Sequence, residues 1–263
     1  IEFRQIKLKK YKSKIKITKR KKNIGYAKNF LLGLKEVGND YDFYAFSDQD
    51  DIWEKDKIIR SINALDSKNS NTPKLYCSRT TYYNSECKKE IGASKNYSKK
   101  PSFANSLLQN IAGGNTIMMN NIARDLVIKT VQSKEYISHD WWCYQIISGA
   151  GGEIIFDKNK TVKYRQHNNN LIGKNNGFHD VKSRILEFAS GKVKQWSDVN
   201  LKNLINFRYL LTEDNNEILE NFRKARIAKN IFEKLSYYFK SGVFRQSKKE
   251  SIIFTIGLIL NMI

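Results

Sequence analysis

Apolar residues in the first quarter of the chain follow strand and helix patterns in turn. Residues 43–46 form an apolar, aromatic run that is too short for a helix and predicts a buried strand. Apolar positions recur at helical spacing before and after this run, which predicts helices over residues 23–37 and 58–65. Asn23 is suited to cap the first of them. Residues 14–18 alternate in the way that a half-buried edge strand does.

The middle of the chain continues to alternate strands with helices. Residues 74–83 are rich in aromatic and β-branched side chains and predict a strand, and the polar residues 84–100 predict a loop. A short helix is expected at 103–108, a strand beginning at Thr116, and another helix over 122–127.

Two short strands, 152–157 and 161–164, are expected next, joined by a turn. Strands that alternate with helices are typical of an α/β fold.

From residue 180 onward the pattern is helical, with Lys and Arg between the apolar positions. We therefore divide the chain into an α/β domain, 1–173, and a basic amphipathic helical tail, 174–263. Residues 252–263 are nearly all apolar but too few to span a bilayer. They either dock on the protein body or contact the surface of an anionic membrane.

Composition and charge narrow the class of partner. A chain of 263 residues with 40% hydrophobic residues can bury a sizeable core. The net charge of +21 favours an anionic partner, but the sequence has no nucleic-acid motif, so we expect no nucleic acid. Cys77, Cys87 and Cys143 lack the spacing of a zinc site or disulfide framework, which favours a reducing cytoplasm.

The most informative chemistry follows the strand at 43–46. Asp48, Asp50 and Asp51 place three carboxylates within four residues at the end of a buried strand, where they repel one another and lose hydration. A hard cation such as Mg²⁺ or Mn²⁺ would stabilise this cluster. The alternative is that one aspartate caps the following helix while the others are solvated.

A second cluster is Ser138-His-Asp-Trp-Trp142, at the expected start of a helix. Asp140 could accept a proton from a hydroxyl, and an aromatic environment would raise its pKa toward that of a useful base. Trp141 and Trp142 could stack on sugars. In the alternative interpretation Asp140 is an N-cap, the tryptophans belong to the core, and His139 only shapes the loop.

Several of these segments together resemble the family 2 glycosyltransferases with the GT-A fold, and most closely the bacterial rhamnosyltransferase-like members. The resemblance covers most of residues 1–173. It is carried by Asn23-x-Gly25-x-x-x-Asn29-Phe30, by Phe46-Ser-Asp-Gln-Asp-Asp-Ile-Trp53, by the Gly113-Gly114 segment, by Asp140, and by Tyr164-Arg-Gln-His167. It implies a mixed sheet with flanking helices and an inverting, metal-dependent transfer of a sugar.

The resemblance also assigns roles to residues of this chain. Asp140 corresponds to the catalytic base. The residues that correspond to the metal position are Asp50, Asp48 and His167. Those that correspond to the donor site are Asn23, Gly25, Asp48, Asp51 and Arg165. Those that correspond to the acceptor site are Gly113, Gly114, Trp141 and Trp142. The implied partners are a dTDP- or UDP-sugar donor and a saccharide or lipid-linked acceptor, at the inner face of the plasma membrane.

The sequence departs from the family in one respect. A strand–helix–strand unit that precedes residue 1 in the family, and forms much of its base pocket, is absent from this sequence, which implies an N-terminally incomplete domain. Two rival hypotheses therefore stand beside the enzyme: a catalytically inactive remnant, and a basic module that binds membrane or nucleic acid.

Overall fold

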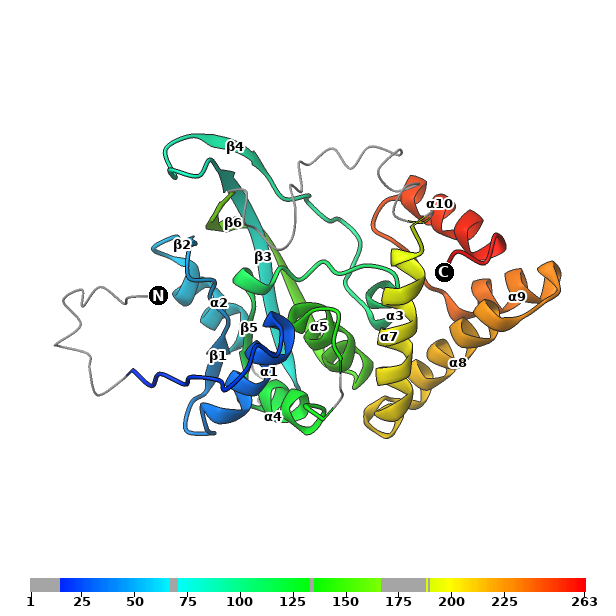
Figure 1. The fold of residues 1–263 in the computed structure, drawn as a ribbon, viewed down its shortest axis with the longest axis horizontal. Coiled ribbons are helices and arrows are strands. Elements are labelled where there is room, and N and C mark those ends of the chain that lie inside the picture. Colours follow the sequence, from blue (N-terminus) through cyan, green and yellow to red (C-terminus); the bar gives the residue numbers. More distant parts are fainter. Residues whose placement is uncertain (1–14, 67–70, 133–134, 167–187, 189) are drawn as a thin grey trace.

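The computed structural model describes residues 15–66, 71–132, 135–166, 188 and 190–263. Its centre is one mixed sheet with the strand order β1-β5-β3-β6-β2 (Figure 1). The strands are β1 (Phe43–Ala45), β2 (Ile52–Trp53), β3 (Lys74–Tyr83), β5 (Met118–Asn120) and β6 (Glu153–Arg165). β4 (Glu90–Ala93) pairs with β3 beside this path. Among the strands of the described residues, β3 and β6 pair in parallel and the other ladders are antiparallel.

Helices cover both faces of this sheet. Side chains on successive strand residues point to opposite faces, so each face presents side chains against which a helix can pack. Leu75 and Met119 face the main core, toward α1 (Tyr26–Glu36), α4 (Asn121–Lys129) and α5 (His139–Gly149). Tyr76 and Met118 face the other side, where they pack with Leu65 of α2 (Lys57–Leu65). The result is the α/β sheet with flanking helices that the sequence predicts.

The C-terminal third is helical, as predicted. It contains α7 (Lys192–Asn206), the 3-10 turn η3 (Arg208–Leu210), α8 (Glu213–Ile227), α9 (Ile231–Ser241) and α10 (Lys248–Ile259), which lie together on one side of the sheet (Figure 1). Their buried residues, including Leu204, Phe222 and Leu258, belong to the same hydrophobic core as the sheet. The predicted domain division at residue 173 lies outside the described residues and stays a prediction.

Polar contacts fasten the segment between α9 and α10 to the loop around α3 (Phe103–Ser106). Arg245 donates to the carbonyl of Leu108, and the backbone N–H of Gln246 donates to Gln109 at 2.9 Å. Glu250 binds both Arg245, at 2.9 Å, and Lys95, at 2.6 Å. Within the described residues, no helix combines the length and the apolar character needed to cross a bilayer.

Two expectations near the N-terminal end were wrong. Residues 15–18 do not form a strand, and Ile17, which a half-buried edge strand would cover, is exposed. Asn23 is not the N-cap of α1, because Gly25, with a φ of 80°, turns the chain and starts the helix. The side chain of Asn23 accepts instead from the Gly25 N–H at 2.9 Å.

Four further corrections concern the middle and end of the chain. The region 84–100 contains β4, and Thr116 closes the 3-10 turn η2 (Gly114–Thr116) before β5 begins. The two strands expected at 152–164 are one strand, β6, whose irregular pairing opposite Ser78–Thr80 absorbs the polar residues. The helical pattern expected from residue 180 onward is interrupted between α8 and α9, where Asn230 caps α9.

Candidate active site

The acidic turn directly follows β1, and its three carboxylates are half-buried. Burial, together with the nearby negative charges of Asp51, Asp50 and Asp140, raises the pKa of Asp48 to about 6. The side chain of Asp140, distant in sequence, is therefore close to this turn. Four aspartates share one region, which brings the two clusters found in the sequence together.

Asp51 connects the acidic turn to two other elements. Its Oδ2 accepts a hydrogen bond from Nδ2 of Asn115 in η2, and its Oδ1 accepts one at 3.3 Å from the backbone N–H of Arg165, at the end of β6. Burial raises the pKa of Asp51, while these two hydrogen bonds act in the opposite direction. Both of its oxygens are thus engaged by the protein.

Asp140 lies in the first turn of α5 and is only 6% exposed. Its Oδ2 accepts from the backbone N–H of Gly114 at 3.0 Å, and its Oδ1 accepts from that of Trp141 at 2.8 Å. The N-cap of α5 is Ser138, whose hydroxyl accepts from Trp141, so the alternative in which Asp140 caps the helix does not hold. Asp140 is a buried, oriented carboxylate.

Gly114 is needed for this contact because no larger residue fits. A Cβ on Gly114 would lie 2.7 Å from Nε2 of His139, inside van der Waals contact. The His139 ring is itself fixed, since it stacks on Phe30 at 4.2 Å and meets the edge of Phe46 at 4.7 Å between centroids. Burial lowers the pKa of His139. The neutral imidazole of His139 therefore packs against the backbone of Gly114.

The two tryptophans have different environments. Trp142 is 1% exposed, donates from Nε1 to Thr130 at 2.8 Å, and packs against Tyr136 and Phe207. It belongs to the core and offers no free ring face to a sugar, as in the alternative interpretation of the sequence. Trp141 is half-buried and donates from Nε1 to the carbonyl of Ser106 at 2.7 Å.

The start of α1 lies at the same site. The hydroxyl of Tyr26 donates to the carbonyl of Ile137 at 3.1 Å, next to the Ser138 cap. Burial raises the pKa of Tyr26 to about 12, with smaller contributions from the charges of Asp140 and Asp48. Tyr26, the first residue of α1, is therefore near Asp140 and Asp48. The N-terminus of a helix favours a bound anion.

Sequence reasoning missed Tyr26, Asn115 and the buried Lys57. Asn115 directly follows the two glycines in the segment already singled out, so its amide could have been included as a donor to a carboxylate. Nothing in the local pattern indicates that Lys57 or Tyr26 lies near the acidic residues, because α1 and α5 come together on one face of the sheet, and α2 packs on the other face, only in the folded chain. His167, an expected metal ligand, lies outside the described residues.

The aspartates supply the oxygen ligands that a divalent cation prefers, but they are not arranged as a complete metal site. Within the described ranges, no group of three or more His, Cys, Asp or Glu side chains is arranged to hold a metal ion. Burial, and after it the negative charges of Asp51 and Asp50, raise the pKa of Asp48, so a bound cation would stabilise its ionised form. Oxygen ligands of this kind suit Mg²⁺ or Mn²⁺, with diphosphate oxygens supplying the remaining ligands.

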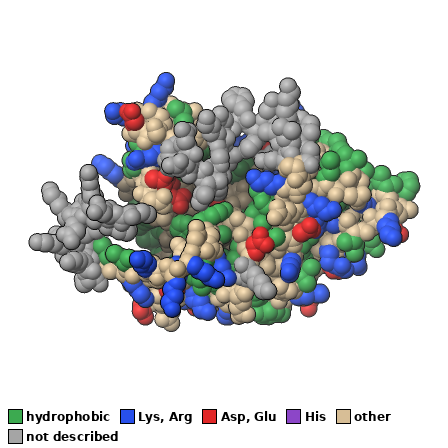
Figure 2. Space-filling view, in the orientation of Figure 1, with side chains coloured by type: hydrophobic (Ala, Val, Ile, Leu, Met, Phe, Trp, Pro, Cys, Tyr) green, Lys and Arg blue, Asp and Glu red, His purple; other side chains and the backbone are tan. Residues whose placement is uncertain are grey.

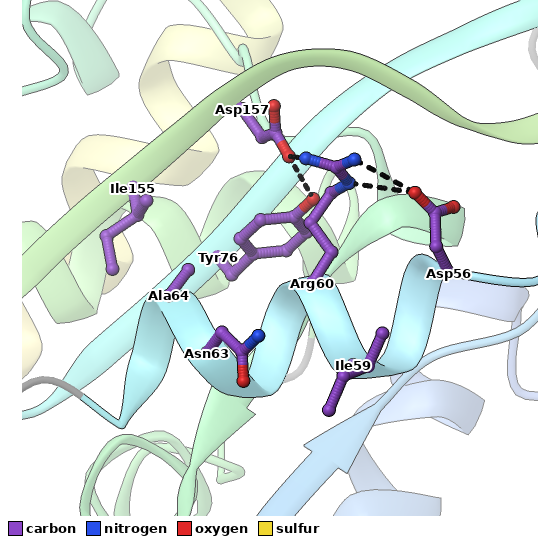
Figure 3. Close-up of a pocket in the computed structure, with 8 residues that line it drawn as sticks. All are labelled: Asp56, Ile59, Arg60, Asn63, Ala64, Tyr76, Ile155 and Asp157. Atoms are coloured by element: carbon purple, nitrogen blue, oxygen red, sulfur yellow. Dashed lines mark hydrogen bonds and ion pairs between the residues drawn. The ribbon is translucent and has the colours of Figure 1, made fainter.

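A cavity of about 520 Å³ lies elsewhere, between α2, β3 and β6 (Figure 3). Its polar groups bind one another: Tyr76 donates to Asp157 at 2.8 Å, and Arg60 donates to Asp56 at 2.9 Å and lies 3.6 Å from Asp157. None of the predicted site residues lines it. The aspartate cluster, rather than this cavity, is the candidate active site.

Comparison with known proteins agrees with this geometry. The family model described as "Glycosyl transferase family 2" matches residues 4–127. A dTDP-rhamnosyl transferase RfbG of Shigella flexneri is 27% identical over 246 residues, which cover 90% of this chain and 78% of that protein. No solved structure matches the chain significantly.

The chain is similar to glycosyltransferase family 2. The resemblance seen in the sequence is therefore confirmed, and so is the class of enzyme: this protein is a glycosyltransferase that uses a nucleotide-sugar donor and an acceptor. In this glycosyltransferase, the family match ends at residue 127, before α5 begins at His139. Asp140 is thus assigned by its own geometry, and the individual site residues remain predictions.

Proposed function

We propose that this glycosyltransferase moves rhamnose from a dTDP-linked donor to a hydroxyl of a growing cell-surface polysaccharide or lipid-linked acceptor, with inversion at the anomeric carbon. The observation that carries the proposal is the buried Asp140, oriented by two backbone N–H groups beside the acidic turn. The nature of the donor is suggested by the printed name of the Shigella relative.

Asp140 would act as the general base. Its carboxylate takes the proton of the acceptor hydroxyl while the hydroxyl oxygen attacks the anomeric carbon. The new bond forms between that oxygen and the anomeric carbon as the bond from this carbon to the diphosphate oxygen breaks, with its electron pair leaving on dTDP. Attack from the face opposite the leaving group inverts the configuration.

The donor diphosphate would lie between the acidic turn and the start of α1. Asp48 and Asp50, with His167, would hold Mg²⁺ or Mn²⁺, which when bound offsets the charge of the diphosphate. Gly25 and the first N–H groups of α1 would face a phosphate, and Arg165 offers a guanidinium fork of matching geometry. Asn23 would orient Gly25 through its 2.9 Å hydrogen bond.

The acceptor would approach from the side of η2 and α5. Gly113 and Gly114 present backbone without side chains, so a sugar ring can come close to the Asp140 carboxylate. The half-buried Trp141 supplies a flat apolar surface next to the base. This arrangement would bring the acceptor hydroxyl and the donor to neighbouring sides of the four aspartates.

We further propose peripheral contact with the cytoplasmic face of an anionic membrane. Along α10, the exposed Lys248 and Lys249 are followed by Ile252, Ile256 and Leu260, which are more than half exposed and spaced by one helical turn. Phe232 and Phe239 of α9 are 79% and 70% exposed. Figure 2 shows hydrophobic side chains gathered over this end of the molecule. Apolar side chains next to lysines suit such a surface.

Titration calorimetry of dTDP and UDP, with and without Mn²⁺, tests the donor site. We expect binding of dTDP that requires Mn²⁺ and is lost in Asp50→Ala but kept in Asp56→Ala, which removes an aspartate outside the acidic turn. A folded wild-type chain that binds neither nucleotide would contradict the proposal and favour an inactive remnant. Sedimentation with anionic and neutral vesicles tests the membrane contact, with Ile252→Ser/Ile256→Ser as the variant.

A further inference from the structure

Trp196 of α7 brings the C-terminal helical region next to the proposed base. Its ring meets the ring of Trp141 in α5 almost at right angles, with 6.3 Å between centroids and an interplanar angle of 86° (Figure 1). Trp141 directly follows Asp140 in the chain, and both tryptophans are half-buried. The family match ends at residue 127 and therefore assigns no role to Trp196.

Other contacts hold α7 in place beside α5. Phe207, at the end of α7, packs against Trp142 with 6.0 Å between ring centroids. The side-chain amide of Asn203 donates at 2.9 Å to the carbonyl of Glu135, in the segment that leads to α5. Because these contacts fix the helix, Trp196 has a defined position in the active-site region, as a binding residue requires.

Core packing alone does not explain a tryptophan at position 196. Leu201 and Leu204 are the α7 side chains that the core encloses, at 4% and 0% exposure, whereas Trp196 keeps part of its ring in solvent. The ammonium of the exposed Lys192 lies 4.8 Å from the centre of this ring. A cation–π contact is weak at such a position, so a ligand can displace the lysine. A flat ring at the boundary between protein and solvent suits a sugar, which has apolar C–H faces and polar edges.

We propose that Trp196 is a second acceptor-binding residue, and that Trp141 and Trp196 together bind an oligosaccharide of at least two sugar units. The backbone N–H of Trp141 binds Asp140 at 2.8 Å, so the sugar that receives the new bond lies against Trp141. Because the two rings are perpendicular, one sugar cannot lie flat on both, and Trp196 binds the next sugar of the acceptor chain. The inference rests on the proposed function, since the acceptor site around Asp140 is itself proposed.

Calorimetric titration of defined saccharides tests this proposal. The probes are mono-, di- and trisaccharides of rhamnose, glucose, galactose and N-acetylglucosamine, titrated with dTDP and Mn²⁺ present and again without them. In one of these series we expect the disaccharide to bind about tenfold more tightly than the monosaccharide. Trp196→Leu should remove this advantage, because leucine fills apolar space but offers no flat ring, whereas Trp196→Phe should keep most of it. The control is Tyr209→Ala, which removes a 71% exposed ring from η3 and should bind like the wild type.

A purely structural role of Trp196 gives a different result. Trp196→Leu and Trp196→Phe would then bind the disaccharide alike, and this outcome would overturn the proposal. A folded wild-type chain that binds no saccharide of the panel would overturn it too, as would a loss of binding in Trp196→Leu that only follows a large drop in its unfolding midpoint. Failure of the proposed function is a separate result: dTDP binding, or transfer from dTDP-rhamnose, would be absent while the difference between the two variants in saccharide binding persists.

Discussion

The backbone N–H of Gly114 donates to Oδ2 of Asp140 at 3.0 Å, and this bond orients the proposed base. The next residue, Asn115, binds Asp51 through its side chain. Two consecutive residues of η2 thus hold one carboxylate from each of the two acidic segments. The acidic turn and α5 are more than 80 residues apart in sequence, and η2 connects their carboxylates.

Asp140→Asn tests the base. The amide keeps the size of the side chain but cannot take a proton from the acceptor, so kcat should fall about 10²- to 10⁴-fold while the Kd for dTDP stays within about twofold. The matched control is Ser138→Ala, which should lower stability by about 1 kcal/mol through loss of the N-cap. It should leave kcat nearly unchanged. An Asp140→Asn enzyme with normal kcat would remove Asp140 from the mechanism.

Gly114→Ala tests the close approach of η2 to α5. Because the added methyl meets His139, the loop must shift and the Gly114–Asp140 hydrogen bond should lengthen, lowering kcat at least tenfold. Gly33→Ala, inside α1 with open space around it, is the control. It should raise the free energy of unfolding by about 0.5–1 kcal/mol without affecting kcat. Equal activity of both variants would show that η2 tolerates the shift.

Trp141 and Trp142 should separate acceptor binding from stability. Trp141→Phe should raise the KM for the acceptor and leave the unfolding midpoint almost unchanged. This ring is half-buried, and the Ser106 carbonyl that loses the Trp141 hydrogen bond still accepts one from Gln145 at 3.2 Å. Trp142→Ala removes a fully buried ring and should cost about 3–5 kcal/mol of folding free energy. Measuring acceptor KM and denaturant unfolding on both variants checks the assignment. A large loss of stability in Trp141→Phe would mean that both rings are core residues.

Glu250 predicts a pH dependence for the C-terminal helices. Burial alone would raise the pKa of Glu250, but Arg245 and Lys95 lower it to about 2. Because the folded pKa lies below the unfolded one, the stabilisation is complete above about pH 4.5. It is lost as the pH falls from about 4.5 toward 2.

Glu250→Gln should therefore destabilise the protein by about 3 kcal/mol at pH 7 and flatten its acid dependence. Glu220→Gln disrupts an exposed pair with Arg223 and serves as the control, with an expected loss below about 1 kcal/mol. Unfolding curves at several pH values measure both. If Glu250→Gln behaved like Glu220→Gln, the Arg245–Glu250 contact would not hold α10 in place.

Local patterns in the sequence predict much of this fold. The apolar run before Asp48 is a strand, and the helical spacing after it is α2, since both depend on residues close in sequence. The patterns fail where a distant partner decides. β6 is continuous because it pairs along β3, and α10 docks through Arg245 to Leu108. Residues 15–18 alternate, yet they pair with no strand among the described residues.

The residues of the candidate site also fall into two groups, those that the sequence reveals and those that only the folded structure reveals. The acidic turn and Asp140 are visible in the sequence because carboxylates next to apolar and aromatic runs are rare enough to stand out. Asn115 and Tyr26 look like ordinary polar residues of a turn or helix. Their importance comes from what they touch after α1 and α5 have packed around the sheet.

The adjacency of Gly114 and Asn115 has a kinetic consequence. A ligand that settles the acidic turn also settles the peptide that aligns the base, so we expect the nucleotide-sugar to bind first and the acceptor second. A movement of the acidic turn before the donor arrives would also move η2, and with it the base, away from the alignment that activates a hydroxyl, water included. Such an order would limit wasteful hydrolysis of the activated sugar, and it needs no separate lid to do so.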